Sequence, residues 1–513
     1  MYPPSAPPRS IRSMRFVMNR GVAAIALLLA GCTVGPNYRE PAPAALGVPA
    51  GYAPPVTASP ASVPAEAAPR PADLSAWWRQ FDDPLLTDLI GRATAGNLQI
   101  AQSLARLAEA REARVQAHGD LLPNVTGTAG ATHDVTHGRA TSIVVGGGNG
   151  SPGTVVTTGG SSASNDFSVG AGASWQADIF GGLRRGLQAA RADEAAALFD
   201  LEGVRTSIAA EVATNYIDAR LDQARLEIAR STLRTQDDNL QIARWRVQAG
   251  LVSALDVEQA RAQRAQVAAS IPALETSYEQ AVARLGTLTG QAPGALRGEM
   301  QAVRAIPRGP DAIAIGIPAD TLRRRPDVRS AERQLAAATA RIGVAKAALF
   351  PALAINGNIG TDAATLGSLG SLITGSLFAG ITQTIFDAGK HRSQVRSARA
   401  ATDFAFANYK QVVLSGLEDV ENAVQALEAA KARQAELAIA LDASNNAAIY
   451  ARSQYQSGLI DFLTLLQSEQ SLLTARDQLA SAQADQAAAI VQLYLALGGG
   501  WQADAPDPNG THA

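Results

Sequence analysis

The chain of 513 residues is poor in the features that mark enzymes, nucleic-acid-binding proteins and disulfide-stabilised proteins. Cys32 is its only cysteine, so no intrachain disulfide can form. Aromatic residues make up 5% of the chain, a low share for a compact enzyme of this size. The formal net charge is −2, which gives no electrostatic argument for a nucleic-acid partner. Alanine, by contrast, is abundant among glutamine, arginine, glutamate and leucine, a composition that favours long helices.

Long apolar runs are also missing. Beyond the N-terminal region no run of about 18 apolar residues occurs, so we expect no membrane-spanning helix in the mature chain. The apolar run at residues 22–30 follows several arginines and is too short to span a bilayer, so residues 1–31 are predicted to be an export signal. The run ends in Ala30-Gly31-Cys32. This placement predicts cleavage before Cys32 and a lipid, such as palmitate, on its sulfur; a free thiol is the alternative.

The chain repeats itself. Pro351 follows Pro123 by 228 positions in a similar local sequence, and Gly458 follows Gly250 by 208. Gly389 follows Gly182 by 207, so the first copy has a longer loop between its proline and its glycine. A long repeat predicts one doubled unit rather than several domains. We expect a lipid-anchored segment at residues 32–84, repeats at 85–290 and 318–500, and a tail at 501–513.

Most of each repeat has helical periodicity. Residues 182–250 contain no proline, and their apolar residues recur at intervals of three and four, which predicts a helix roughly 100 Å long. Residues 389–458 are its counterpart. Shorter helices are predicted at 85–119 and 253–290, and at 318–346 and 460–498, with Ser253 and Asp461 as N-caps. Each short pair is about as long as one long helix and should lie end to end beside it. An ordinary elongated coiled coil is the alternative.

Four segments alternate apolar with small polar residues, which predicts β-strands at residues 121–136, 167–180, 351–361 and 376–386. A transmembrane strand shows the same alternation, although the core of a soluble sandwich does too. Four strands cannot close a membrane barrel, and an open edge is not tolerated in lipid. If these strands lie in a membrane, several chains must share one barrel.

Five motifs, in this order along the chain, resemble those of the TolC-like outer membrane factor family, in particular its lipoprotein branch typified by OprM and NodT. They are Gly31-Cys32-Thr33-Val34-Gly35-Pro36-Asn37-Tyr38, Trp77-Trp78-Arg79-Gln80-Phe81, Arg325-Pro326-Asp327-Val328, Ile385-Phe386-Asp387-Ala388-Gly389 and Ala496-Leu497-Gly498-Gly499-Gly500-Trp501. The resemblance implies an α+β membrane protein. Three copies would form a twelve-stranded transmembrane β-barrel on a long periplasmic α-helical barrel, lipid-anchored in the outer membrane.

The resemblance also implies a function. The trimer would be the outer membrane channel of a tripartite efflux system that exports drugs or other small toxic compounds. Its partners would be a periplasmic adaptor (membrane fusion) protein and an inner-membrane pump of the RND type. Two alternatives remain open: a structural or adhesive coiled-coil lipoprotein without a pore, and a duct for type I protein secretion.

Two groups of residues are candidate sites. The turns between helices carry exposed apolar residues that a partner should cover, which predicts adaptor docking at Gly250, Leu251, Val252, Ser253, Gly458, Leu459, Ile460 and Asp461. Leu463, Gln467 and Gln470 share one helical face and would form rings near the closed tip of a trimer. The resemblance implies a leucine constriction at Leu463 and an aspartate ring at the position of Gln467, where this chain has a neutral amide. Asp461 and Glu469 are the next candidates for this gate.

No enzyme site is predicted. His133 and His137 would lie about 13 Å apart along a strand, which is too far for a shared metal ion. The glycine-rich residues 146–150 lack the lysine of a phosphate-binding loop. Arg323-Arg324-Arg325 is interpreted as a solvated basic run. We therefore expect no catalytic residues, no cofactor and no metal site.

Overall fold

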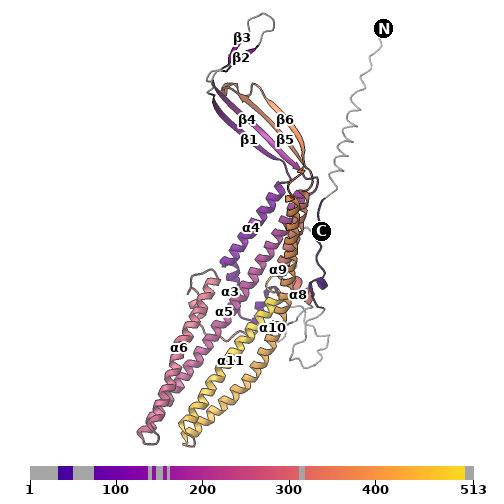
Figure 1. The fold of residues 1–513 in the computed structure, drawn as a ribbon. Coiled ribbons are helices and arrows are strands. Elements are labelled where there is room, and N and C mark those ends of the chain that lie inside the picture. The colour runs from indigo at the N-terminus through magenta and orange to yellow at the C-terminus, as the bar shows by residue number, and fades with distance from the viewer. Residues whose placement is uncertain are drawn as a thin grey trace, which may run out of the picture. The chain divides into compact units, whose positions relative to one another are not determined.

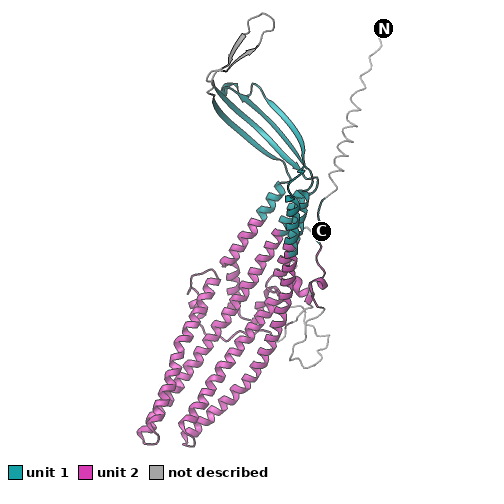
Figure 2. Cartoon of the chain, in the orientation of Figure 1, with its two compact units in different colours: residues 1–38, 111–192, 336–403 teal, residues 39–110, 193–335, 404–513 magenta. Residues whose placement is uncertain are grey.

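The computed structural model describes residues 33–49, 74–136, 141–145, 154–158, 162–310, 313 and 318–502. The chain divides into two compact units (Figure 2). Unit 1 takes residues 1–38, 111–192 and 336–403, and unit 2 takes residues 39–110, 193–335 and 404–513. Each unit therefore draws on both sequence repeats.

Unit 1 contains a four-stranded antiparallel sheet with the order β1-β4-β5-β6 (Figure 1). The strands are β1 (Asn124–Thr136), β4 (Ser162–Ala177), β5 (Ala352–Ala363) and β6 (Thr374–Thr382). A separate hairpin, β2 (Thr141–Val145) with β3 (Thr154–Thr158), occupies part of the longer loop of the first repeat. A single 3₁₀ turn, η3 (Leu366–Ser368), lies between β5 and β6.

The strand register gives the sheet two different faces. One row across the sheet joins Val125, Ala173, Gly357 and Leu377, and the next joins Asn124, Ser174, Asn356 and Phe378. The first face is mostly apolar, although it also carries His133 and Asn165, and the second is mostly polar, with Ala352, Ala354 and Phe378 as exceptions. The apolar side chains are not buried within the chain: Val125 is 71% exposed and Leu377 is 81% exposed.

The predicted strands are confirmed in kind but not in every boundary. β6 ends at Thr382 instead of reaching residue 386, because its partner β5 begins at Ala352, which pairs with Thr382. Ile385 and Phe386 are therefore outside the sheet. The first strand begins at Asn124 and not at Leu121, whose backbone N–H closes a turn on the His118 carbonyl.

The two long helices appear as α5 (Gly182–Gln248) and α10 (Lys390–Gln456), each of 67 residues. The helices that follow them are α6 (Ala254–Leu288) and α11 (Phe462–Ala496). Short elements are α2 (Pro43–Leu46), η2 (Leu74–Phe81) and α7 (Arg297–Met300). Among the described residues, no helix combines the length and the apolarity that crossing a membrane requires.

Two expected helices are each broken in two. The first is α3 (Pro84–Gly96) followed by α4 (Leu98–Gly119), with Asn97 between them in extended geometry. The Asn97 amide oxygen accepts from the N–H groups of Gln99 and Ile100, and its amide nitrogen donates to the Leu288 carbonyl, so it caps the new helix. The second is α8 (Pro318–Arg324) followed by α9 (Pro326–Ala347), because Pro326 disfavours helical geometry at the residue before it.

The core of unit 2 is formed by aromatic and aliphatic side chains of η2, α3, α5 and α11. Trp77 is 1% exposed and stacks on Tyr494, with ring centroids 5.5 Å apart. A second cluster in this unit includes Leu240, Tyr455, Phe462 and Leu465 beside the helical turns.

Backbone geometry corrects the alignment of the repeats by one residue. Gly181 and Gly389 both have positive φ, and each accepts at its carbonyl from the N–H four residues on, of Arg185 and Ser393 respectively. Gly389 therefore corresponds to Gly181 and not to Gly182. The offset between the second halves of the repeats is 208 throughout, as it is between the starts of α5 and α10.

Candidate functional site: the helical turns and the start of α11

Both helical turns, which lie in unit 2, end their long helix in the same way. Gly250 has a φ of 72° and Gly458 a φ of 74°. The Leu251 N–H donates to the Arg246 carbonyl at 2.9 Å, and the Leu459 N–H donates to the Gln454 carbonyl at 2.9 Å. With the glycine N–H bonds, these form Schellman motifs, in which a left-handed residue closes the helix. The conformation favours glycine at both positions.

The next helix is capped at once in each repeat. The Ser253 hydroxyl accepts from the Leu255 N–H at 3.0 Å, and the Asp461 carboxylate accepts from the Thr464 N–H at 2.8 Å. Both predicted N-caps are thus confirmed. The hydrogen bonds from Thr464 lower the pKa of Asp461 below its ordinary value.

The leucines of the turns are left uncovered. In a Schellman motif the apolar residue after the glycine often packs back on its own helix. Here it does not, since Leu251 is 68% exposed and Leu459 is 75% exposed. The turns are therefore closed by backbone hydrogen bonds and are apolar at their surface.

The start of α11 has one buried and one exposed face. Leu463, Gln467 and Gln470 are all exposed, as their shared face requires. The Gln470 side-chain oxygen accepts from the Gln263 side chain of α6 at 2.5 Å. The opposite face carries Phe462 and Leu465, which are buried.

Glu469 belongs to the buried face, although it was a reserve candidate for the gate. Its side chain is 4% exposed and lies 3.1 Å from the Arg452 guanidinium. It also accepts from Gln236 at 3.1 Å and from Asn239. Burial raises the pKa of Glu469, and Arg452 and the two amides oppose that rise. This carboxylate joins α5, α10 and α11 within one chain.

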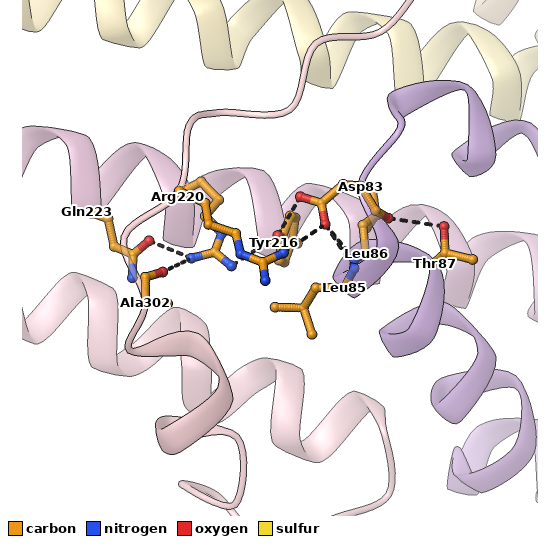
Figure 3. Close-up of polar contacts among 9 residues, drawn as sticks. Asp83, Leu85, Leu86, Thr87, Tyr216, Arg220, Gln223 and Ala302 are labelled. Atoms are coloured by element: carbon orange, nitrogen blue, oxygen red, sulfur yellow. Dashed lines mark hydrogen bonds and ion pairs between the residues drawn. The ribbon is translucent and has the colours of Figure 1, made fainter.

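A second polar network in unit 2 was not foreseen from the sequence (Figure 3). Arg220 is fully buried and donates to the Ala302 carbonyl at 2.9 Å and to the Tyr216 hydroxyl at 3.0 Å. The Tyr216 hydroxyl donates to the Asp83 carboxylate at 2.6 Å. Burial, and then the bond to Asp83, raises the pKa of Tyr216 to about 12. The sequence signal that could have indicated this network is that Arg220 follows Tyr216 by four positions, which places both side chains on one face of a helix.

The basic run at residues 323–325 is not uniformly solvated. Arg325 is 8% exposed and forms ion pairs with Asp327 at 2.7 Å and with Asp419 at 2.8 Å. It lies where α8 ends against α10, so carboxylates surround it. Arg323 remains exposed, 3.8 Å from Asp320.

The remaining candidate positions are the two histidines, the glycine-rich residues 146–150 and Cys32. Over the described part of the chain, no group of three or more histidine, cysteine, aspartate or glutamate side chains could hold a metal ion. His133 lies 2.6 Å from the Asn165 side chain. Cys32, His137 and residues 146–150 lie outside the described residues.

Known proteins resemble the chain over most of its length. The family model described as outer membrane efflux protein matches residues 89–291 and 317–499. Nodulation protein T of Rhizobium leguminosarum bv. trifolii is 29% identical over 477 residues, covering 93% of this chain and 96% of that protein. The pyoverdine export outer membrane protein OpmQ of Pseudomonas putida is 30% identical over 468 residues, covering 91% and 95%. The structure of the outer-membrane channel OprN aligns with a TM-score of 0.80 at 36% identity, covering 92% and 100%.

Proposed function

Because the chain belongs to the outer membrane efflux protein family, we propose that three copies of it form the outer membrane channel of a tripartite efflux system. Members of this family are outer membrane channel proteins, which confirms both the resemblance and the expectation that the chain is not an enzyme. The outer membrane location follows from the same relatives.

The sheet is the main observation that supports the proposal of a shared channel. Its edge strands β1 and β6 have no partner strand among the described residues, and its apolar face is exposed. Unpaired strand edges are costly in lipid, and four strands are too few to close a barrel. Pairing β1 of one copy with β6 of the next removes both edges, and three copies give twelve strands. The apolar face then meets lipid and the polar face lines the channel.

The turns support docking on an adaptor. Leu251 and Leu459 present apolar surface on turns closed by backbone hydrogen bonds, and a partner that covers them would lower the free energy of the assembly. Val252 and Ile460 and the flanking glycines and caps complete the docking surface. An inner-membrane pump of the RND type would supply the exported compound.

Two further assignments belong to this proposal. Cys32 would carry the lipid anchor after removal of the signal. Leu463, Gln467 and Gln470 would form rings near the closed tip, and the amide of Gln467 would leave its ring without the field of a carboxylate ring. The exposure of all three side chains in the single chain supports this placement.

The exported compounds are small and toxic to the cell. Relatives are named for pyoverdine export, toluene efflux and antibiotic efflux, which are all small molecules. Secretion of proteins is the alternative cargo for the same duct.

Two experiments test the channel, one on the purified protein and one in cells. The purified protein in detergent should be a trimer by light scattering and should conduct ions in planar bilayers once its tip is opened. A strain that lacks the gene should accumulate small toxic compounds and recover on complementation. A stable monomer without channel activity under any opening condition would favour the adhesive alternative.

A further inference from the structure

The polar face of the sheet carries one aromatic side chain. Its positions on β1, β4, β5 and β6 are otherwise filled mostly by threonine, serine, asparagine and glycine. Within these four strands, Phe378 of β6 is the only aromatic residue on that face, and its side chain is 63% exposed. An aromatic surface is thus presented on a wall that is otherwise small and polar.

A glycine lets the Phe378 ring lie along its own strand. A Cβ added to Gly380, two residues further on the same face, would lie 2.6 Å from Cε1 and 2.7 Å from Cζ of Phe378. These distances are too short for a real Cβ contact, so only glycine leaves room for the ring at this place. The far end of the ring therefore covers Gly380, and most of the side chain stays open to solvent.

An open hollow of about 530 Å³ lies on the polar face beside this ring. Its floor includes Asn356 and Ala354 of β5, which are the strand partners of Phe378 and Gly380. The rest of its lining comes from β1, β4, the end of α4 and the turn after it, and includes Gln116, Asp120, Asn124 and Gln176. All of these residues belong to unit 1. The volume falls within the roughly 300–1,000 Å³ that small-molecule sites occupy.

The hollow is lined by amides and one carboxylate. Gln116, Gln176 and Asn356 are exposed, and each amide offers two donor hydrogens and an acceptor oxygen. Their side chains form no hydrogen bond with any other residue that the structure describes. Asp120 is the only charged residue in the lining. The hollow therefore offers hydrogen-bonding groups and one negative charge beside an aromatic surface.

We propose that the hollow and the Phe378 ring together bind exported compounds that combine a flat aromatic ring with hydrogen-bonding and cationic groups. The aromatic part of such a compound stacks on Phe378, and its polar part reaches the amides of the hollow. Asp120 attracts a positive group and repels a negative one. The proposal rests on the channel proposed above, in which the polar face lines the lumen, and it names the class of compound that this face holds.

In the proposed channel the occupant of this site is the exported compound, because the equivalent rings of three copies cannot meet. Twelve strands about 4.8 Å apart and tilted by about 40° enclose a cylinder with a radius of roughly 12 Å. Equivalent residues of three copies are then separated by about 20 Å at the backbone, which is more than two phenylalanine side chains can span. Each copy therefore offers its own site.

A purely structural role for Phe378 is the alternative. An aromatic ring that covers a glycine can stabilise a strand without binding any compound. In that case a change at Phe378 lowers the stability of the trimer and leaves the affinity of the channel for compounds as it was.

Block of the channel by small probes tests the proposal. The purified full chain is placed in planar bilayers, its tip is opened, and the concentration that halves the current is measured for two amines. Naphthylmethylamine has a flat aromatic ring, and decahydronaphthylmethylamine is the same cation with a saturated ring. The aromatic amine should block at a concentration about 2- to 12-fold lower, because stacking adds to the burial of area that both rings share.

Variants on β6 show whether the ring causes this difference. Phe378→Leu should remove it, and Gly380→Ala should reduce it, because the added Cβ displaces the ring. Phe378→Tyr should retain it. Leu377→Ala is the matched control, because Leu377 is 81% exposed on the opposite face and its loss should leave the difference unchanged.

A charge variant tests the carboxylate of the hollow. Naphthalenecarboxylate places an anion on the same aromatic ring and should block the channel less well than naphthylmethylamine. Asp120→Asn should narrow that gap by about 1.5- to 5-fold, which is the range for exposed charge pairs. It should leave the difference between the two amines unchanged.

The outcomes separate this site from the channel itself. Equal block by the two amines in the unmodified channel, or a difference that survives both Phe378→Leu and Gly380→Ala, overturns the site and leaves the channel standing. Lower trimer stability in these variants with an unchanged difference assigns Phe378 the structural role, which also overturns the site. A chain that forms no conducting trimer overturns both proposals.

Discussion

Replacing Leu251 and Leu459 by aspartate should abolish export and leave the trimer intact. Both leucines follow the glycine of a Schellman motif, and only their backbone N–H groups take part in closing the turn. Their side chains are 68% and 75% exposed, so the folded chain loses little when they change. Substitutions at such exposed positions usually alter the free energy of unfolding by no more than about 0.5 kcal/mol.

The loss of binding free energy in docking should be much larger than this effect on the free energy of unfolding. Full burial of a leucine side chain contributes about 1.5–3 kcal/mol. Since about two thirds to three quarters of each side chain is still exposed, docking can bury that share, which is roughly 1–2 kcal/mol per leucine. Two leucines together give roughly 2–4 kcal/mol, or about a 30- to 1,000-fold change in affinity. An aspartate that must be desolvated adds to the loss.

The assay is growth of a complemented efflux-deficient strain on a toxic substrate, with co-purification of the adaptor. Val303→Asp is the matched control, because Val303 is also 68% exposed but lies outside the turns. The control should export normally. Normal export by the leucine double variant, with adaptor still bound, would refute docking at these turns.

Four further results are expected. Intact mass spectrometry of the mature protein should show Cys32 as its first residue with attached acyl chains, and an unmodified thiol would contradict the anchor. Leu463→Ala should raise closed-state conductance and leak of bulky antibiotics, and Gln467→Asp should raise cation selectivity in planar bilayers; a gate elsewhere would leave both unchanged. Because burial raises the pKa of Glu469, the folded chain binds that proton more tightly, and the stability of the α11 start should fall as the pH rises above the ordinary value of 4.5. Hydrogen exchange should show this, and Glu469→Gln should remove the pH dependence. Asn97→Ala should lower the free energy of unfolding by about 1–3 kcal/mol in thermal or denaturant melts, because it leaves the buried Leu288 carbonyl and the α4 N-terminus unpaired.

The sequence predicted the long elements because their patterns extend over many residues. Helices α5 and α10 end within two residues of the predicted glycines, and the alternation in β1 and β4 gave the two faces of the sheet. Repetition strengthened each pattern by showing it twice. The two turns were predicted from their glycines and from the N-caps Ser253 and Asp461. A glycine turn and an N-cap involve only residues close together in the chain, so both can be recognised in the sequence.

What was missed depends on contacts between distant residues. Asn97 breaks a helix because it reaches the Leu288 carbonyl, and helical periodicity continues through it. Arg325 is buried because Asp419 lies on another helix. Glu469 was named as a reserve candidate for the gate and not as a buried residue, because its partners Gln236 and Asn239 are about 230 residues away in the chain. The end of β6 depends on where β5 begins. Local patterns contain none of this information.

The duplication makes one repeat a reference for the other, which resolves what exposure alone cannot. Among the described residues, the large exposed apolar side chains include several on the sheet and one leucine on each turn. On the turns the leucines of both repeats are exposed, which is what the proposed docking on a separate partner protein would require. On the sheet the mostly apolar face continues across the strands of both repeats, which fits a continuous apolar surrounding such as lipid, as the proposed channel would have, better than a single partner.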